Sequence, residues 1–338
     1  MIALLQSSRM KKSPLRVVIV GGGFFGSKRL QACLELSETF QVMAVIDPSE
    51  QQRFHVMNTY HIPAVESFSM LSKPAELAII ATPNIFHAEA SIEAMKRGMH
   101  VLCEKPLATR VNDAERIVRA AKRYKKIVKT GSNHRFFHTI QKAKELYDKG
   151  SIGTLLNFKG SIGTNGSRVS RKWFWNKEWA GGGTFIDNGC HLIDLARMFL
   201  GDFTSVTASM ETNLWKKAGV EDMGTAIFRT KDGRLATISS SWYQWAGYLH
   251  IELWGEKGYI IVDSTTHDTV TIGGVDGEVV TYDYSHEKKD SYQRELLYLE
   301  SCIRKHAVPS PNASDGAAII ALIDAAYISS RDKTWKKI

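Results

Sequence analysis

The sequence is poor in the features that mark membrane, secreted and disordered proteins. No apolar run approaches the ~18 residues that a membrane-spanning helix needs. The opening ten residues lack a basic leading region, a long apolar core and a clear cleavage site, which argues against a secretory signal peptide. Only 8 prolines are present and 43% of the residues are hydrophobic, which is typical of a globular chain. We find no internal repeat and no low-complexity stretch.

Cysteine is also scarce. The four cysteines (Cys33, Cys103, Cys190 and Cys302) are scattered and show neither CxxC nor the Cys/His spacing of a zinc site. We therefore expect reduced thiols, no metal and a cytoplasmic protein. Residues 1–13 are expected to form a disordered extension, with Met10 as an alternative start.

The formal net charge of +9 raises the question of nucleic-acid binding. Eight basic and two acidic residues lie between Arg110 and Lys129, on a predicted helix with an apolar stripe that contains Ala114 and Ile117. The cations are therefore expected on a solvated outer face. No nucleic-acid motif accompanies them, so neither a nucleic-acid nor a membrane partner is expected.

A glycine-rich turn follows the first predicted strand. Residues 15–20, LRVVIV, are apolar and β-branched, and they lead into a G-x-G-x-x-G at residues 21–26 and then into a helical pattern. Gly21 allows the tight turn, Gly23 lets the backbone approach a pyrophosphate, and Gly26 permits close helix–strand packing. The helix N-terminus then offers free N–H groups to the phosphates. This pattern predicts dinucleotide binding.

An acid ends the second predicted strand. Residues 41–47 close on Asp47, 21 residues after Gly26, where a carboxylate accepts from an adenosine ribose hydroxyl. Such a carboxylate repels a 2′-phosphate, and the nearest cation in sequence is Arg53. We therefore expect NAD rather than NADP.

Polar residues follow two further predicted strands. Residues 77–81 run into Thr82-Pro83-Asn84, and residues 99–103 run into Glu104-Lys105-Pro106. Ligands of doubly wound sheets bind at the carboxyl ends of strands, so these residues are expected to face the cofactor. Lys105 places a cation beside the reacting carbon; the alternative is an ordinary solvated loop lysine.

The pattern changes after residues 129–133. Segments 225–230, 234–243 and 248–255 predict a mostly antiparallel sheet, and helices are expected near 136–149, 290–306 and 314–330. The predicted fold class is α/β. It combines an N-terminal doubly wound Rossmann domain (14–131) with a C-terminal α+β domain (132–338) that has a large, open sheet and carries substrate binding and oligomerisation. The closing helices can pack back on the first domain.

Four tryptophans lie in or beside these strands: Trp215, Trp242, Trp245 and Trp254. They indicate either an exposed aromatic face of the sheet or side chains beneath the helix that covers it.

Residues 181–201, GGGTFIDNGCHLIDLARMFLG, open with three glycines and continue with helical spacing. Asp187, His191 and Asp194 fall on one helical face, away from the apolar one. A carboxylate one turn before an imidazole can share a proton with it, which makes an acid–base pair. The alternative is a helix-capping Asp and a surface His.

These motifs together resemble the Gfo/Idh/MocA family, the glucose–fructose oxidoreductase and inositol dehydrogenase group. The resemblance runs from about residue 15 to about residue 335, and EKP with DxGxH is specific to the family. In family order the motifs are G-x-G-x-x-G at 21–26, ATPNxxH at 81–87, CEKP at 103–106 and GGGxxxDxGxHxxD at 181–194. Family members commonly carry His where this chain has Arg29.

The resemblance implies a site. Lys105 matches the catalytic lysine, and Asp187 and His191 match the acid–base pair. Residues expected at the cofactor are Gly21, Gly23, Phe24, Phe25, Gly26, Asp47, Thr82, Pro83, Asn84, His87, Glu104, Lys105 and Asn133. Residues expected at the substrate are Lys105, Arg135, Trp173, Trp175, Lys177, Asp187 and His191.

The resemblance also implies an activity: hydride transfer between nicotinamide and a secondary alcohol of a sugar, a sugar derivative or a cyclitol. His191 would take the hydroxyl proton, Asp187 would orient it, and Lys105 would stabilise alkoxide charge. Family sheets pair between subunits, so a homodimer or homotetramer is expected. The alternatives are an NADP-dependent sugar reductase and a non-catalytic, NAD-sensing regulator; a regulator has no reason to keep all three residues.

Overall fold

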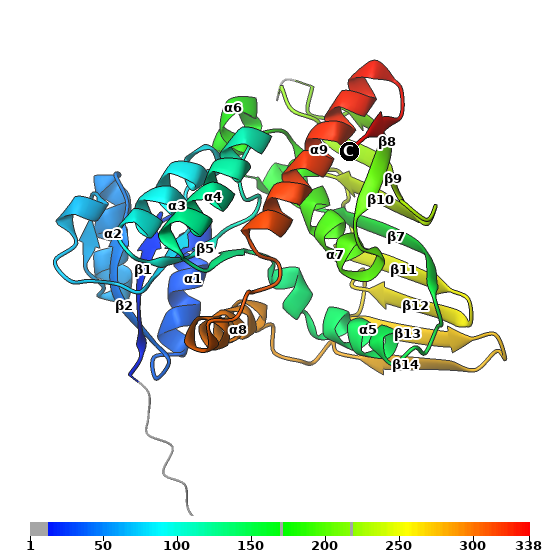
Figure 1. Ribbon diagram of the computed structural model, residues 1–338, viewed down its shortest axis with the longest axis horizontal. Coiled ribbons are helices and arrows are strands. Elements are labelled where there is room, and N and C mark those ends of the chain that lie inside the picture. Colours follow the sequence, from blue (N-terminus) through cyan, green and yellow to red (C-terminus); the bar gives the residue numbers. More distant parts are fainter. Residues whose placement is uncertain (1–12, 170–171, 217–218) are drawn as a thin grey trace, which may run out of the picture.

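The computed structural model describes residues 13–169, 172–216 and 219–338, and it shows two lobes, each built on its own sheet (Figure 1). Of the expected N-terminal extension (1–13), residues 1–12 lie outside the described residues. In Figure 1 the first lobe lies on the left and the sheet of the second lobe lies on the right, with helices between them.

The first sheet is parallel and has the strand order β3-β2-β1-β4-β5-β6, which reverses between β1 and β4. This is the order of a doubly wound Rossmann sheet, as the sequence predicts. Alternate residues of β1 pack into cores on opposite faces, Val18 and Val20 on one and Val17 and Ile19 on the other. Its strands are β1 (Leu15–Val20), β2 (Phe40–Ile46), β3 (Ala64–Val65), β4 (Leu77–Ile80), β5 (His100–Cys103) and β6 (Val128–Thr130).

Helices cover both faces of this sheet, as buried parallel strands require. Short 3₁₀ turns occupy Phe68–Met70 and Asn84–Phe86. The helices are α1 (Phe24–Glu35), α2 (Glu50–Tyr60), α3 (His87–Lys96) and α4 (Val111–Tyr124).

The second sheet has nine strands in the order β14-β13-β12-β11-β7-β10-β9-β8-β15, all antiparallel except for the β7–β10 pair. Residues alternate between the faces: on β11, Leu249, Ile251 and Leu253 are buried, whereas His250 and Glu252 are partly exposed. The mostly antiparallel open sheet is confirmed. Its strands are β7 (Leu155–Gly163), β8 (Phe203–Glu211), β9 (Met223–Thr230), β10 (Leu235–Ser241), β11 (Leu249–Gly255), β12 (Gly258–Asp263), β13 (Thr269–Gly274), β14 (Val279–Asp283) and β15 (Lys336–Lys337).

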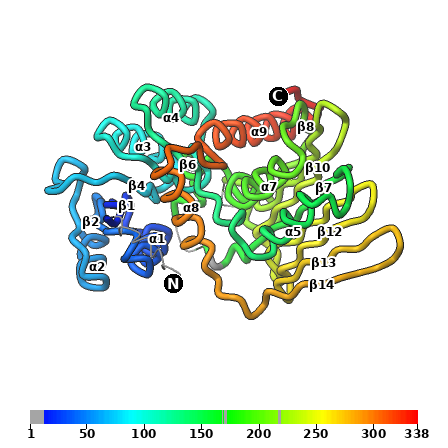
Figure 2. Tube along the Cα trace, turned by 60° about the horizontal axis from the view of Figure 1, so that its bottom comes forward, coloured from blue at the N-terminus to red at the C-terminus, as the bar shows by residue number. Residues whose placement is uncertain are grey.

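One face of this sheet is covered by α5 (His138–Asp148), a π-helical turn (Phe185–Gly189) and α7 (Cys190–Leu200) (Figure 1). The last two long helices return toward the first lobe. In Figure 2, α8 (Ser291–Lys305) lies beside α1, and α9 (Ala313–Asp332) lies along α4 and β8.

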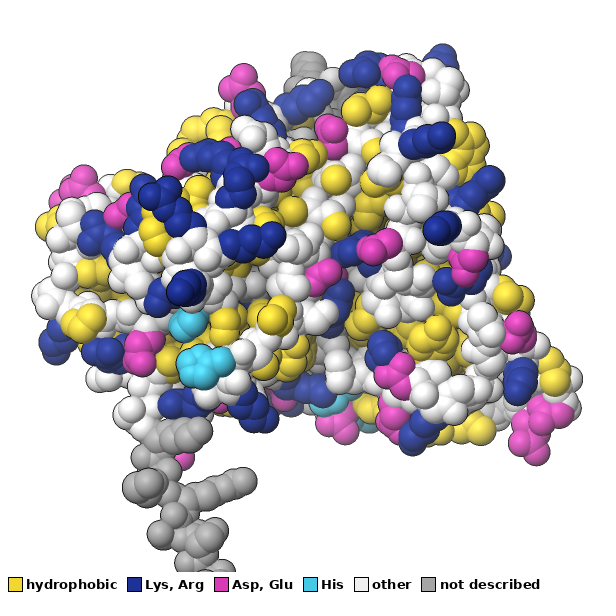
Figure 3. Space-filling model, in the orientation of Figure 1, with side chains coloured by type: hydrophobic (Ala, Val, Ile, Leu, Met, Phe, Trp, Pro, Cys, Tyr) yellow, Lys and Arg dark blue, Asp and Glu magenta, His cyan; other side chains and the backbone are white. Residues whose placement is uncertain are grey.

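The basic run is mostly solvated, with one exception. Lys and Arg side chains gather over the helices of the first lobe (Figure 3). Arg119, Lys122 and Arg123 are exposed on α4. Lys129 instead lies on β6, fully buried, and binds Glu295 at 2.7 Å. Placing all eight cations on the outer face was therefore wrong for Lys129, because the helix ends at Tyr124 and a buried strand follows.

The four tryptophans divide into two groups. Trp242 is fully buried and packs with Trp215 and Trp175 in a separate aromatic cluster. Trp245 and Trp254 are exposed, by 63% and 40%. The exposed aromatic face holds for Trp254 on β11, whereas Trp242 and Trp215 lie in this separate cluster and not beneath the helices that cover the sheet.

Candidate active site

The glycine loop joins β1 to α1 at the carboxyl edge of the first sheet. Gly21 has a φ of +101°, and a Cβ there would lie 2.6 Å from the carbonyl oxygen of Ala81. A Cβ on Gly26 would lie 1.8 Å from the carbonyl oxygen of Gly21. A Cβ on Gly23, by contrast, would meet nothing within 4 Å. Gly21 and Gly26 are therefore required by close backbone approaches within the protein, while Gly23 leaves its open space to a ligand.

A cavity of about 680 Å³ opens in front of this loop. At its edge, the Asp47 carboxylate accepts from the backbone N–H groups of Gly22 at 2.7 Å and Ser49 at 2.8 Å. The buried Thr82 hydroxyl in its wall has no hydrogen-bond partner among the described residues. An orphaned hydroxyl beside an open glycine backbone fits a polar ligand with a phosphate group. The lining includes Gly21, Gly23, Phe24, Phe25, Asp47, Thr82, Pro83, Asn84, His87, Glu104, Lys105, Trp173 and Asp187.

A second hollow of about 430 Å³ lies between the two lobes. It is lined by Asn133 and His134 from the segment that follows β6, by His191 from α7, and by Tyr248 and Tyr292. The cavity and the hollow have five lining residues in common: Phe25, Glu104, Lys105, Phe174 and Asp187. The two spaces therefore meet at the end of β5.

Lys105 and Asp187 form an ion pair at this junction. Lys105 Nζ donates to Asp187 Oδ1 at 2.7 Å and to the Asp187 carbonyl oxygen at 2.8 Å, with the side chains 13% and 18% exposed. Burial alone would lower the pKa of Lys105, but the Asp187 carboxylate outweighs it and the pKa is raised. Lys105 is therefore a charged donor at neutral pH.

The π-helical turn sets the position of Asp187. Such turns interrupt the regular ladder and occur frequently at functional sites. Both oxygens of the Glu221 carboxylate hold the start of this turn, accepting from the N–H groups of Gly183 at 2.8 Å and Phe185 at 3.1 Å. Tyr327 donates to the same carboxylate at 2.8 Å. The segment that carries Asp187 is thus anchored by Glu221, which Tyr327 of α9 holds in turn.

His191 faces the hollow without bonding to Asp187. Among the described residues no hydrogen bond joins the two side chains; the His191 ring packs against the His134 ring, with centroids 3.7 Å apart. Burial, with His134 and Lys105 nearby, lowers the pKa of His191 well below 6.5. The expected proton-sharing pair is thus replaced by a Lys105–Asp187 pair and a neutral imidazole, because the π turn directs Asp187 at Lys105.

The other predicted site residues divide by location. Asn84 donates to the Ala180 carbonyl at 2.9 Å, and both His87 ring nitrogens lie within 3.0 Å of backbone carbonyl oxygens. Asn133 donates to Ser291 Oγ at 3.1 Å. Arg135 makes a two-pronged pair with Asp194 at 2.6 and 2.7 Å, beside the hollow and not in its lining.

Two further expected substrate residues lie elsewhere. Lys177 lines a different cavity, next to Arg110 and Asp324. Trp175 packs on Trp242, with ring centroids 4.8 Å apart.

His134 and Tyr248 were not singled out from the sequence. His134 Nε2 and the Tyr248 hydroxyl lie 2.7 Å apart, and burial lowers the pKa of His134 to about 3. Burial also raises the pKa of Tyr248. The sequence signal for His134 was its place beside Asn133. Tyr248 follows 114 residues later, and no local spacing indicates it.

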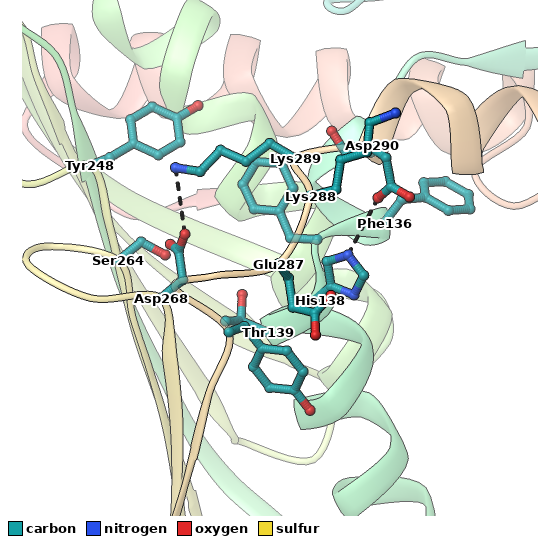
Figure 4. Close-up of a pocket in the computed structure, with 13 residues that line it drawn as sticks. Phe136, His138, Thr139, Tyr248, Ser264, Asp268, Glu287, Lys288, Lys289 and Asp290 are labelled. Atoms are coloured by element: carbon teal, nitrogen blue, oxygen red, sulfur yellow. Dashed lines mark ion pairs between the residues drawn. The ribbon is translucent and has the colours of Figure 1, made fainter. Parts of the chain in front are cut away.

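A third cavity of about 290 Å³ lies behind Tyr248 (Figure 4). A Lys289–Asp268 ion pair crosses it at 3.5 Å, and His138 Nε2 lies 3.3 Å from Asp290 Oδ1. The Asn133–Ser291 and His134–Tyr248 hydrogen bonds lie between this cavity and the hollow. They close the back wall of the hollow.

The fold and the two joined spaces define a class of protein that holds a dinucleotide against a second small ligand. Comparisons with known proteins give the family. Residues 15–132 match the oxidoreductase family with an NAD-binding Rossmann fold, and residues 140–261 match the GFO/IDH/MocA C-terminal domain. The chain belongs to the Gfo/Idh/MocA oxidoreductase family. The predicted family, enzyme class and NAD-binding fold are confirmed.

Relatives agree with this assignment. The chain is 26% identical over 340 residues to myo-inositol 2-dehydrogenase from Thermotoga maritima, covering 96% of this chain and 98% of that protein. It is 30% identical over 246 residues to D-glucoside 3-dehydrogenase from Escherichia coli, covering 68% of each. A solved structure of levoglucosan dehydrogenase in complex with NADH has the same fold, with a TM-score of 0.88 at 22% identity, covering 96% of this chain and 99% of that one. No described helix is long and apolar enough to cross a membrane.

Proposed function

We propose that this protein is an NAD-dependent dehydrogenase acting on a secondary alcohol of a sugar, a sugar derivative or a cyclitol. The observation that carries the proposal is the junction of the glycine-loop cavity and the hollow at Lys105 and Asp187, with His191 lining the hollow. NAD, when bound, supplies the acceptor for the substrate's hydride. The relatives named above are an inositol and a glucoside dehydrogenase, which supports the substrate class.

The proposed chemistry needs one proton acceptor and one cationic donor. His191 is neutral at physiological pH and takes the hydroxyl proton of the substrate. Lys105 donates to the reacting oxygen and stabilises negative charge on it, and Asp187 holds the ammonium in place. Burial of the site strengthens the interaction of Lys105 with the reacting oxygen, because screening by water is reduced.

The screen that tests this function combines inositols, free sugars, glycosides and sugar phosphates with NAD and with NADP. Absorbance at the reduced nicotinamide band reports turnover. Turnover of at least one polyol or sugar with NAD supports the proposal. Tight nucleotide binding with no turnover on any compound favours the non-catalytic regulator, and turnover with NADP alone favours the sugar reductase.

NAD should bind at least tenfold more tightly than NADP, about 1.4 kcal/mol. Asp47 presents a carboxylate at the edge of the cavity that accepts ribose hydroxyls and repels a 2′-phosphate. Arg53 Nη1 donates to the backbone carbonyls of Asp47 and Pro48, at 2.9 and 2.8 Å. Calorimetric titration of both nucleotides measures the ratio; equal affinities contradict the assignment of Asp47.

We also expect a homodimer or homotetramer that pairs through the open face of the second sheet. That face carries Trp254, 40% exposed, with Tyr259 and Ile261 partly exposed on the neighbouring β12 and Ile227 partly exposed on β9. Light scattering of the purified protein measures its mass. Replacing Trp254 and Ile261 by Asp should shift the mass toward the monomer, and an unchanged mass places the interface elsewhere. The four cysteine thiols are all unpaired and buried, which supports the proposed reducing, cytoplasmic location.

A further inference from the structure

Four charged side chains form a cluster behind the floor of the hollow. Arg29 comes from α1, Glu104 from the end of β5, Lys129 from β6 and Glu295 from α8. Their side chains are 0%, 9%, 0% and 0% exposed. Two positive and two negative charges balance, so each buried charge has a partner within hydrogen-bond distance. The cluster joins four elements that are far apart in the sequence.

Arg29 is the centre of this cluster. Its Nε donates to Glu104 Oε1 at 2.6 Å, and its Nη2 donates to Glu295 Oε2 at 2.7 Å. Its guanidinium also lies 4.5 Å from the ring centroid of Tyr292. Burial opposes the charge, but Glu104 and Glu295 outweigh it and raise the pKa of Arg29. Arg29 is thus a permanent cation, and it contacts Glu104 and Tyr292, which both line the hollow.

Glu295 connects the cluster to the segment that carries Asn133 and His134 in the wall of the hollow. Its Oε1 accepts from Lys129 Nζ and from the backbone N–H of Ser132, both at 2.7 Å. Burial alone would raise the pKa of Glu295, but Lys129 and Arg29 lower it to about 2. Ser132 directly precedes Asn133 and His134, so the cluster also fixes the segment that carries them.

Glu104 has one carboxylate oxygen left for a ligand. It lines both the cavity and the hollow, and Arg29 occupies Oε1. No donor from the described residues bonds to Oε2. Gly131 keeps the space beside that oxygen free, since a Cβ there would lie 3.2 Å from Oε2 and 3.1 Å from Glu104 Cα.

We propose that Arg29 is a positioning residue that holds the Glu104 carboxylate aimed so that Oε2 accepts an O–H or N–H donor of the nicotinamide nucleotide. The proposal uses the family's NAD-binding fold and rests on the proposed function only for its effect on turnover. An arginine suits this position because its planar fork reaches two carboxylates at once and stays charged at any physiological pH. A histidine there would not carry a fixed charge, because imidazole titrates within the physiological range.

Arg29 is the cation that pairs with Glu104, because the other ionisable groups nearby are uncharged or paired elsewhere. Burial lowers the pKa of His87 and raises those of Cys103 and Tyr292 to about 12, so all three are uncharged near neutral pH. Lys105 is charged but paired with Asp187. The groups that interact with Glu104 are Arg29 of α1, His87 of α3, the adjacent Cys103 and Tyr292 of α8. Lys105 follows Glu104 in the sequence, and Glu295 of α8 is linked to it through Arg29.

The test is NADH affinity as a function of pH, measured by nucleotide fluorescence from pH 5.5 to 9. The wild-type dissociation constant should stay flat. R29M should bind at least tenfold more weakly and lose further affinity toward low pH, because a buried carboxylate without its cation takes up a proton more readily. R29K should restore the flat profile, and adding E104Q to R29M should remove the pH dependence. R16M, which breaks the half-exposed Arg16–Glu76 pair, is the matched control and should bind normally.

The outcomes are decisive in each direction. Wild-type binding by R29M, or a loss that is independent of pH and not rescued by R29K, overturns the proposal. Should R29M fail to fold, R29K and R29H carry the test: a flat profile for lysine and a pH-dependent one for histidine support it, and identical profiles overturn it. Because the assay needs no substrate, its failure is distinguishable from a wrong proposed function, which only the turnover screen reveals.

Discussion

Replacing Lys105 by Ala should lower kcat by about 10²- to 10⁴-fold, the usual value of a positioned donor or proton-transfer group. Lys105 Nζ lies at the junction of the two spaces and is the charged donor nearest to Asp187 in the structure. Its loss removes the group that stabilises charge on the reacting oxygen. It also leaves the Asp187 carboxylate, whose side chain is only 18% exposed, without its cation. Because this unpaired charge disturbs the substrate site, KM should rise as well.

Steady-state kinetics on a substrate from the turnover screen measures this effect. K122A is the matched control, since Lys122 is exposed on α4, and it should keep normal kcat and KM. A K105A enzyme with near-normal kcat removes Lys105 from the chemistry and leaves it a structural role with Asp187.

Replacing His191 by Ala should lower kcat by about 10²- to 10⁴-fold in the oxidative direction, because the proton acceptor is lost. NADH affinity should scarcely change, because His191 lines the hollow and not the glycine-loop cavity. H267A, which alters an exposed histidine in the turn between β12 and β13, should leave both constants unchanged. Near-normal turnover in H191A shows that His191 only packs against His134.

The pH profile of the wild-type enzyme follows from the same assignment. The pKa of His191 lies well below 6.5, so the neutral, proton-accepting form persists as the pH falls through 6.5. kcat/KM for oxidation should therefore stay level from pH 8 to below 6.5 and decline only at lower pH. An acid limb centred near pH 6.5 contradicts a desolvated His191 as the base.

Local signals in the sequence were sufficient for most of the fold. The G-x-G-x-x-G turn needs the positive φ of Gly21 and the close approach of Gly26 to the Gly21 carbonyl oxygen, both of which are set within the turn itself. Alternation along residues 249–253 reveals which face of β11 is buried. Patterns of this kind are set by backbone geometry and periodicity. They can therefore be recognised in the sequence without knowledge of the tertiary structure.

The partners within the site could not be predicted in the same way. Lys105 and Asp187 are 82 residues apart, and the π turn that brings them together has no signal in helical spacing. Arg135 looked available to a substrate because its partner, Asp194, lies 59 residues away. Long-range ion pairs depend on how the two lobes meet, which a single sequence does not display.

The central claim is that a substrate in the hollow passes hydride to a nucleotide in the glycine-loop cavity. The most direct measurement uses a substrate deuterated at the carbon that bears the reacting hydroxyl, with NAD as the only acceptor. Mass spectrometry of the nucleotide product should find one deuterium in NADH, and K105A should form that product at least about 10²-fold more slowly. NADH without deuterium, or no reduced nucleotide from any sugar or cyclitol, contradicts the account.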